Sequence, residues 1–312
     1  MTGSSSSLTV ATFDVTEDAD RLVENVLAIG PCIVAYSGGV DSAVVAAAAH
    51  RADLHRADLH RADSHRADQH PVDQHRSIAV TADSPSVSRE QLETALRVAK
   101  ELGLWHRVIE TDELDREDYR VNDRQRCFYC KQTLYRALAA FAKSQGITSI
   151  LSGTNADDLG DYRPGIQAGR DAGVVAPLAL LGLTKARVRA IARHWGISVS
   201  DRPAQPCLSS RLAYGVGVTR ERLRKIELAE AFLRERGYST LRVRMLADEE
   251  ASIEVSLGDI VRLTEAMELT AITDYCHSIG FTRVRVDPRG FRSGSMNELV
   301  QLTATTPDSR ST

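Results

Sequence analysis

Residues 36–42 read Tyr-Ser-Gly-Gly-Val-Asp-Ser and stand between an apolar run and a run rich in alanine and valine. These flanking runs predict a buried strand followed by a helix, with the serines and glycines in the loop between them. Glycine lets a backbone approach a phosphate closely, and helix N-termini attract anions. The loop has no Walker lysine and is not Gly-x-Gly-x-x-Gly. It is either a ligand-free turn or, as we predict, a phosphate-binding loop formed by Ser37, Gly38, Gly39, Asp41 and Ser42.

Cysteines carry a second chemical signal. Cys127 and Cys130 form a Cys-x-x-Cys pair at the start of a predicted helix, and Cys207 lies in a proline-rich segment. The pair alone fits a redox couple, half a zinc site or half an iron–sulfur site, and no second pair completes a structural zinc site. Three thiolates would leave one iron of a cubane cluster open to an extra sulfide; the alternative is buried cysteines without a function. Cys32 and Cys276 are expected in the core.

Polar residues follow another predicted strand in Gly-Thr-Asn-Ala-Asp-Asp at 153–158. Asn155 could orient a nucleotide, and the carboxylates could hold Mg²⁺ through water. A solvated acidic turn is the alternative.

Arginines form a further candidate site. Arg242 and Arg244 alternate on one predicted strand, so both point to the same side. Together with Arg211 they could bind a phosphate or a carboxylate. The alternative is a solvated strand face.

The order of elements predicts how these residues are positioned. Strands are expected at 32–36, 77–82, 104–109 and 149–152, and they alternate with helices. This alternation predicts an α/β fold with a parallel sheet and helices on both faces. Ligands of such sheets bind at the carboxyl ends of the strands, where the phosphate loop, Asp83 and Gly153 to Asn155 fall. Beyond residue 200, a helix at 219–236, strands at 241–246, 252–256 and 282–287, and a helix at 259–278 predict a smaller α+β domain.

We therefore expect a phosphate-loop domain over 17–200, a smaller domain over 201–302, and flexible ends at 1–16 and 303–312.

Residues 50–76 repeat the pentapeptide His-Arg-Ala-Asp-Leu with variations. A metal-binding tract is one interpretation, but a step of five residues turns about 140° around a helix, so successive histidines do not share a face. A solvated loop grown by repeat expansion is the favoured interpretation.

Composition limits the partners. The 312 residues carry a net charge of −3 from 39 basic and 42 acidic side chains, which does not suggest binding to nucleic acid or to a membrane surface. No run of 18 apolar residues occurs, and the N-terminal segment does not resemble a signal peptide. Five cysteines, an odd number, argue against a disulfide framework. We expect a cytoplasmic protein.

Taken together, these motifs resemble the LarE family of the PP-loop ATP pyrophosphatase superfamily. The phosphate loop alone is typical of the superfamily, whereas the later blocks are more specific. The resemblance spans about residues 17–299, apart from the repeat at 50–76. It rests on Ser-Gly-Gly-Val-Asp-Ser at 37–42, Arg-Cys-Phe-Tyr-Cys-Lys at 126–131, Gly-Thr-Asn-Ala-Asp-Asp at 153–158, Pro-Cys-Leu-Ser-Ser-Arg at 206–211, Arg-Val-Arg at 242–244 and Gly-Phe-Arg-Ser-Gly-Ser at 290–295.

The resemblance implies an ATP-dependent sulfur transferase in the biosynthesis of the nickel-pincer nucleotide cofactor. The family substrate is pyridinium-3,5-biscarboxylic acid mononucleotide. Its carboxylate attacks the α-phosphorus of ATP, pyrophosphate leaves, and a sulfur nucleophile then displaces AMP to give a thiocarboxylate. The implied cofactors are ATP and Mg²⁺. The implied site residues are Asp41 and Cys207 for catalysis, Ser37, Gly38, Gly39, Asp41, Ser42, Asp83, Gly153 and Asn155 for the nucleotide, and Ser210, Arg211, Arg242 and Arg244 for the substrate.

The family has two forms. One sacrifices the sulfur of its own cysteine, and the other holds a 4Fe–4S cluster with three cysteines. Cys127, Cys130 and Cys207 make this chain resemble the cluster form.

The expected partner is a small nucleotide substrate, with an unidentified sulfur donor, and we expect a homo-oligomer. The rival functions are another PP-loop adenylating enzyme, such as a tRNA thiolase, which should show a basic surface, and a non-catalytic iron–sulfur or nucleotide sensor, which need not retain Asp41 and Ser42.

Overall fold

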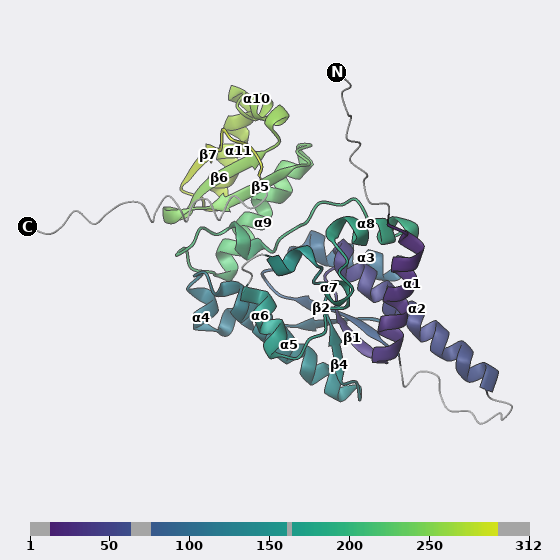
Figure 1. The fold of residues 1–312 in the computed structure, drawn as a ribbon. Coiled ribbons are helices and arrows are strands. Elements are labelled where there is room, and N and C mark those ends of the chain that lie inside the picture. The colour runs from purple at the N-terminus through teal and green to yellow at the C-terminus, as the bar shows by residue number, and fades with distance from the viewer. Residues whose placement is uncertain (1–12, 64–75, 161–163, 293–312) are drawn as a thin grey trace, which may run out of the picture. The chain divides into compact units, whose positions relative to one another are not determined.

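The computed structural model describes residues 13–63, 76–160 and 164–292, and the chain divides into two compact units (Figure 1). The first unit comprises Met1–Asp83, Arg89–Thr111 and Cys130–Gln205, and the second comprises Ser84–Ser88, Asp112–Tyr129 and Pro206–Thr312. The expected flexible end at 303–312 and residues 1–12 lie outside the described residues, whereas the first helix already begins at Val15. How far the units act as separate domains stays a prediction.

The first unit contains a four-stranded sheet in the order β3-β2-β1-β4, and every neighbouring pair is parallel. On the central strand, Ile33 pairs with Ile78 on one side and with Ile150 on the other. The predicted α/β class is confirmed. The strands are β1 (Cys32–Ala35), β2 (Ile78–Asp83), β3 (His106–Glu110) and β4 (Ser149–Leu151).

Helices cover both faces of this sheet because its central strand is apolar on both sides. Val34 packs with residues of α1, α2, α3 and α8, while its neighbour Ile33 packs with residues of α5 on the opposite face. The longer helices are α1 (Val15–Ile29), α2 (Val40–Asp63), α3 (Arg89–Glu101), α5 (Arg126–Ser144) and α8 (Lys185–His194), and α6 (Pro164–Asp171) and α7 (Pro177–Leu180) are shorter.

The pentapeptide repeat departs from expectation. The predicted solvated loop is wrong over residues 50–63, because α2 continues through them to Asp63. Ala52 is fully buried, and the Asp53 carboxylate accepts hydrogen bonds from the Ser77 backbone nitrogen (2.8 Å) and hydroxyl (3.1 Å). Arg56 pairs with Asp53 in turn. The first repeat is therefore packed into the unit, and residues 64–75 lie outside the described residues.

The second unit contains a three-stranded sheet in the order β5-β6-β7, in which β5 and β6 are antiparallel and β6 and β7 are parallel. The single helix predicted at 259–278 is wrong, because two helices, α10 (Ile260–Leu263) and α11 (Ala266–Ser278), occupy that stretch. The other elements are α4 (Glu117–Arg120), α9 (Arg220–Glu235), β5 (Leu241–Met245), β6 (Glu250–Val255) and β7 (Arg283–Val286).

The two faces of this small sheet differ in chemistry. Val243 pairs with Ile253, and both are fully buried on the apolar face. Arg242 pairs with Glu254, and Arg244 with Ser252, on the other face. Alternation along each strand therefore separates an apolar core from a layer of charged side chains.

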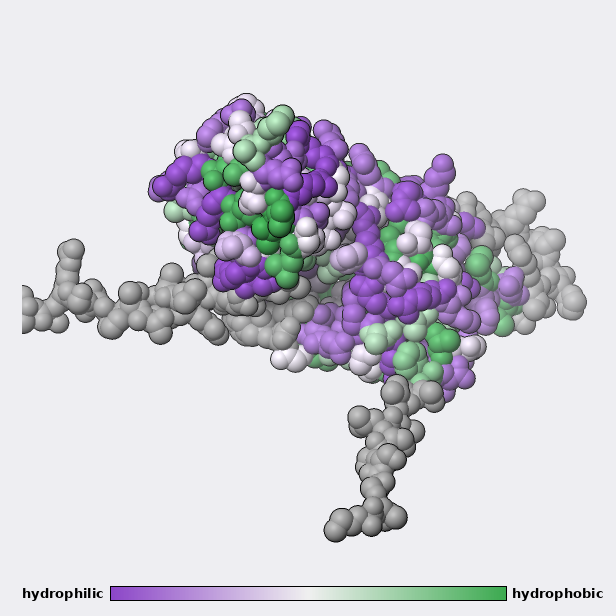
Figure 2. All heavy atoms as spheres, turned by 90° about the horizontal axis from the view of Figure 1, so that it is seen from above, coloured by the Kyte–Doolittle hydropathy of each residue, from purple (hydrophilic) through white to green (hydrophobic). Residues whose placement is uncertain are grey.

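Hydrophilic side chains cover most of each unit on the face shown in Figure 2. Within the described ranges, no helix is both long and apolar enough to cross a bilayer.

Candidate active site

The phosphate loop joins the end of β1 to the start of α2, as predicted. Gly38 has a φ of +74°, a conformation that favours glycine, and a Cβ there would lie 2.7 Å from Cα of Ala95 in α3. Both the backbone conformation and the lack of space therefore require glycine at this position. The loop can approach α3 closely only because it has no side chain there.

Hydroxyl groups hold the loop in shape. The Ser42 hydroxyl donates to the Gly39 carbonyl (3.0 Å) and accepts from the Ser37 backbone nitrogen (3.1 Å), and the Ser37 and Ser42 hydroxyls lie 3.2 Å apart. The loop is thus pre-organised at the N-terminus of α2, where the helix dipole favours an anion.

The structure brings the Gly-Thr-Asn block next to this loop. A Cβ on Gly153 would lie 2.7 Å from the Ser42 backbone nitrogen, so glycine is required for the close approach. The approach follows from topology, because β4 is the parallel neighbour of β1 and both strands end at the same edge. Asn155 then places its amide Nδ2 3.4 Å from Asp41 Oδ1.

Asp41 has a second partner that the sequence analysis missed. The Lys185 ammonium group forms an ion pair with the Asp41 carboxylate, and both side chains are about one-quarter to one-third exposed. Lys185 is the first residue of α8, and its backbone nitrogen donates to Asp157 Oδ2 (2.8 Å). Thr184 caps that helix. A capping threonine marks a helix start but does not reveal which loop the next lysine reaches. The site therefore has the cation that its loop sequence lacks.

Asp83 ends β2 at the same edge of the sheet, but its carboxylate is bound by the Arg89 guanidinium at 2.6 and 3.2 Å. Its predicted role toward a nucleotide stays a prediction.

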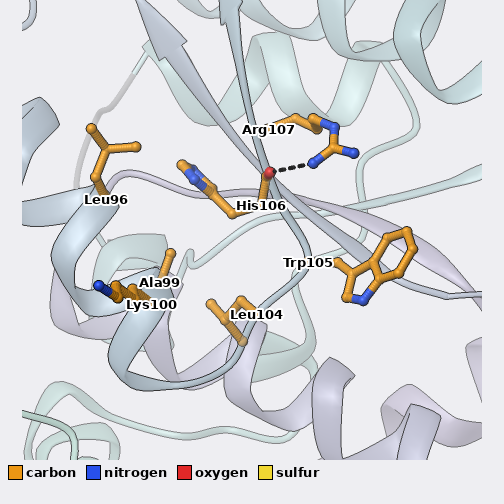
Figure 3. A pocket seen from close by; sticks show the side chains of 7 residues that line it. All are labelled: Leu96, Ala99, Lys100, Leu104, Trp105, His106 and Arg107. Atoms are coloured by element: carbon orange, nitrogen blue, oxygen red, sulfur yellow. Dashed lines mark hydrogen bonds between the residues drawn. The ribbon is translucent and has the colours of Figure 1, made fainter.

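A hollow of about 430 Å³ lies at the N-terminal end of β3, between that strand and α3 (Figure 3). Trp105, His106 and Arg107 line it together with Lys100 and apolar residues of α3, and Arg107 donates to the His106 carbonyl. Because the lining comes from the beginning of a parallel strand, this hollow does not lie at the carboxyl edge where the phosphate loop is. We do not assign it to the active site.

The three predicted cysteine ligands are not gathered into one ligand group. Cys127 and Cys130 lie in the first turn and a half of α5, where Cys127 is exposed and Cys130 partly exposed, and Cys207 is partly exposed. Among the described residues, no three His, Cys, Asp or Glu side chains are placed to hold a metal ion. Three thiols have the donor chemistry of an iron–sulfur site, and their role as ligands stays a prediction, because Cys130 belongs to the first unit and the other two cysteines to the second.

Cys32 and Cys276 are buried, as expected. Burial raises the pKa of the Cys32 thiol to about 12 and that of Cys276 to about 11. These two thiols are therefore protonated near neutral pH and are not candidate nucleophiles.

Arg211, Arg242 and Arg244 are all buried in the second unit, so a solvated strand face is ruled out. Arg211 pairs with Glu230 (3.1 Å), and Arg244 pairs with Glu254. The Ser210 carbonyl accepts from Arg244, 3.3 Å away, so the predicted Ser210 lies beside this group.

Arg242 differs from the other two arginines. Its guanidinium lies over the Phe291 ring, 4.7 Å from the ring centroid, and its Nε has no hydrogen-bond partner among the described residues. Burial, with help from the charges of Arg244 and Arg211, lowers the pKa of Arg242 to about 10. Three guanidinium groups thus face two carboxylates, and the excess positive charge suits an anion such as a phosphate.

A parallel α/β sheet with a Ser-Gly-Gly-Val-Asp-Ser loop at its carboxyl edge defines a PP-loop protein of the ATP pyrophosphatase class. In agreement, the asparagine synthase family model matches residues 21–166. The chain belongs to the family of the pyridinium-3,5-bisthiocarboxylic acid mononucleotide synthase of Lactiplantibacillus plantarum, called LarE. It is 31% identical to that protein over 268 residues, which cover 85% of this chain and 88% of the relative.

Two uncharacterized proteins are also similar. One from Synechocystis is 36% identical over 268 residues (86% of this chain, 92% of the relative). The other, from Methanocaldococcus jannaschii, is 26% identical over 262 residues (84% of this chain, 90% of the relative). The similarity thus extends over most of each chain.

Proposed function

We propose that this protein is an ATP-dependent sulfur transferase of nickel-pincer cofactor biosynthesis. It would adenylate a carboxylate of pyridinium-3,5-biscarboxylic acid mononucleotide with release of pyrophosphate, and then exchange AMP for sulfur to form a thiocarboxylate. The proposal is supported by the relationship to the Lactiplantibacillus plantarum synthase over most of both chains. It is also supported by the phosphate loop and by the buried arginines of the second unit.

In the first step, a carboxylate oxygen of the substrate attacks the α-phosphorus of ATP, because a free carboxylate is a poor electrophile. Negative charge develops on the departing pyrophosphate. Backbone amides around Gly38 and Gly39 and the Lys185 ammonium group are suited to stabilise that charge. Mg²⁺ bound with ATP would supply further charge neutralisation, with Asp41 and the Asp157–Asp158 pair as candidate carboxylates.

The arginines would hold the substrate phosphate. Arg242 is the best candidate for direct contact, because the two neighbouring arginines already pair with glutamates. A phosphate there would give Arg242 an anionic hydrogen-bond acceptor, which its Nε does not have among the described residues.

Sulfur transfer is assigned to the cysteines, with Cys207 as the residue nearest the reaction. A 4Fe–4S cluster held by Cys127, Cys130 and Cys207 would supply a labile sulfide. Because these thiols are not gathered in one ligand group among the described residues, we derive no step through a cluster.

The observation that carries the proposal is the phosphate loop without a Walker lysine, which favours cleavage at the α-phosphorus. The test uses full-length protein, ATP labelled in the adenine and in the γ-phosphate, the biscarboxylate nucleotide, and sulfide as the sulfur source. We expect AMP and pyrophosphate in equal amounts, dependent on the nucleotide. Asp41→Asn should abolish both products, while the exposed Asp20→Asn is the matched control. Stoichiometric ADP in place of AMP would end the proposal.

A further inference from the structure

Arg126, the first residue of α5, is a buried cation with an unusual set of partners. Only 5% of the surface of this residue is exposed, and its Nη1 donates to Asn122 Oδ1 and to the Ser209 carbonyl (2.6 Å). Both acceptors are neutral. Within the ranges that the structure describes, no carboxylate lies within 4 Å of this guanidinium, whereas buried Arg211 and Arg244 each have a glutamate.

A buried charge without a counter-charge is costly, so an anion is expected nearby. The sulfur atoms are the candidates. Cys127 Sγ lies 4.0 Å from Arg126 Nη2. Burial by itself disfavours the charged guanidinium and lowers the pKa of Arg126. The negative charge that Cys207 and Cys127 can carry has the opposite effect, and the net result is a raised pKa.

The surrounding hydrogen bonds fix Arg126 relative to both cysteines. Ser209, whose carbonyl binds Arg126, is two residues after Cys207, and its hydroxyl lies 2.6 Å from the Tyr119 hydroxyl. Asn122 donates to the carbonyls of Ala213 and Val216, each at 2.8 Å. All these residues belong to the second unit. The guanidinium therefore holds a defined position between its neighbour Cys127 and the segment that carries Cys207.

We propose that Arg126 is the fixed counter-cation of an anionic sulfur centre at Cys127 and Cys207, and that it makes this place selective for anionic over neutral sulfur species and reagents. The ligand class is a small sulfur anion, for which hydrosulfide is the simplest case. Arg126 is a positioning residue here and does not itself react. The inference rests on the proposed sulfur chemistry but needs neither ATP nor substrate for its test.

The test compares alkylation of full-length protein by iodoacetate, which is anionic, and by iodoacetamide, which is neutral, with each cysteine followed by mass spectrometry. In both reactions a thiolate forms an S–C bond and iodide leaves. The ratio of the two rates is independent of the thiolate fraction, because both reagents consume the same thiolate. The ratio therefore reports the local electrostatic potential.

In wild-type protein, we expect the iodoacetate-to-iodoacetamide ratio at Cys127 and Cys207 to exceed that of glutathione by about threefold to tenfold, from a unit charge several ångströms away. Arg126→Gln should bring the ratio down to the glutathione value at both cysteines. Arg126→Lys should retain most of it. Arg124→Gln, which removes an exposed arginine two residues away, is the matched control.

A wild-type ratio equal to that of glutathione would overturn the inference, and this measurement needs no variant to fold. An unchanged ratio in a folded Arg126→Gln protein would overturn it as well. The outcome is separate from the proposed function: a high, Arg126-dependent ratio in a protein that forms no AMP would retain this inference and reject the sulfur-transferase proposal.

Discussion

Lys185 at the start of α8 forms an ion pair with Asp41 at the start of α2, 144 residues earlier in the chain. A phosphate loop without its own lysine thus has one supplied by a distant helix. When ATP binds, its phosphates would compete with Asp41 for this ammonium group, and freed Asp41 could then take part in binding Mg²⁺.

The first prediction concerns this lysine. Lys185→Met should lower the rate of nucleotide-dependent AMP formation by about 100-fold or more, the usual effect of removing one group that stabilises developing charge. Lys185→Arg should retain part of the rate because the charge remains. Rapid-quench measurement of AMP under saturating ATP separates this effect from weaker binding. The exposed Lys143→Met is the control, and a Lys185→Met protein with the wild-type rate would exclude Lys185 from the chemistry.

The second prediction concerns the arginine group. Arg242→Met should leave stability unchanged or raise it, because it removes a buried guanidinium that forms no ion pair among the described residues, yet it should weaken binding of the nucleotide substrate by about 10-fold to 100-fold. Arg244→Met should instead lower the free energy of unfolding by about 3–5 kcal/mol, because Glu254 loses its partner in the core. Urea unfolding and calorimetric titration measure the two quantities. Equal loss of stability in both variants would contradict this assignment.

A third prediction concerns the pentapeptide repeat. Asp53→Ala should lower the free energy of unfolding by about 1–3 kcal/mol, because the Ser77 backbone nitrogen and hydroxyl lose their acceptor. Urea unfolding compares it with the exposed Asp20→Ala. Replacing the repeat from residue 51 onward should destabilise the protein for the same reason. A neutral result would mean that the first repeat is dispensable.

A fourth prediction follows from His106, whose pKa is lowered by burial and by the charge of Arg107. In the unfolded chain, histidine titrates near pH 6.5. The unfolded state therefore binds more protons just below that pH, and the contribution of His106 to stability is present above it and lost as pH falls. His106→Gln should flatten the profile of unfolding free energy against pH, measured by urea unfolding, between about pH 7 and 5. Parallel profiles for wild type and His106→Gln would refute this role.

The fifth prediction separates the two sulfur chemistries. If Cys127, Cys130 and Cys207 hold one cluster, alanine at any of them should remove the visible absorbance of the anaerobically reconstituted protein and stop sulfur transfer, while adenylation, followed as pyrophosphate release, continues. If Cys207 is sacrificed, only Cys207→Ala stops transfer, and wild-type protein loses about 34 Da, the mass of H₂S, in one turnover. Intact-mass measurement after a single turnover decides between them.

Much of the first unit was predictable because its signals are local. Apolar runs mark β1 and the start of α2. In the second unit, the alternation of side chains along β5 correctly predicted that Arg242 and Arg244 lie on one face of the strand. The roles of Lys185 and Arg126 could not be predicted, because Lys185 pairs with Asp41 and Arg126 donates to the Ser209 carbonyl, and both of these partners lie far away in the sequence.

The helical start of the repeat was missed for another reason. Its alanines, leucines and arginines favour a helix, but a period of five gives no amphipathic stripe, so the pattern alone resembled a loop. The burial of Ala52 and the contact of Asp53 with Ser77 are tertiary interactions that the local pattern does not contain, and they hold the first repeat in the helix.

The second unit is built from three separate stretches of sequence, which limits how the protein can be truncated or fused. Residues 84–88 and 112–129 belong to that unit, although each is flanked by segments of the first. A fragment starting at Pro206 would therefore lack Ser86, Tyr119 and Arg126, which all form hydrogen bonds with Ser209. Because neither unit is one continuous stretch of sequence, a gene fusion could not transfer either unit alone. We therefore expect both units to be inherited together.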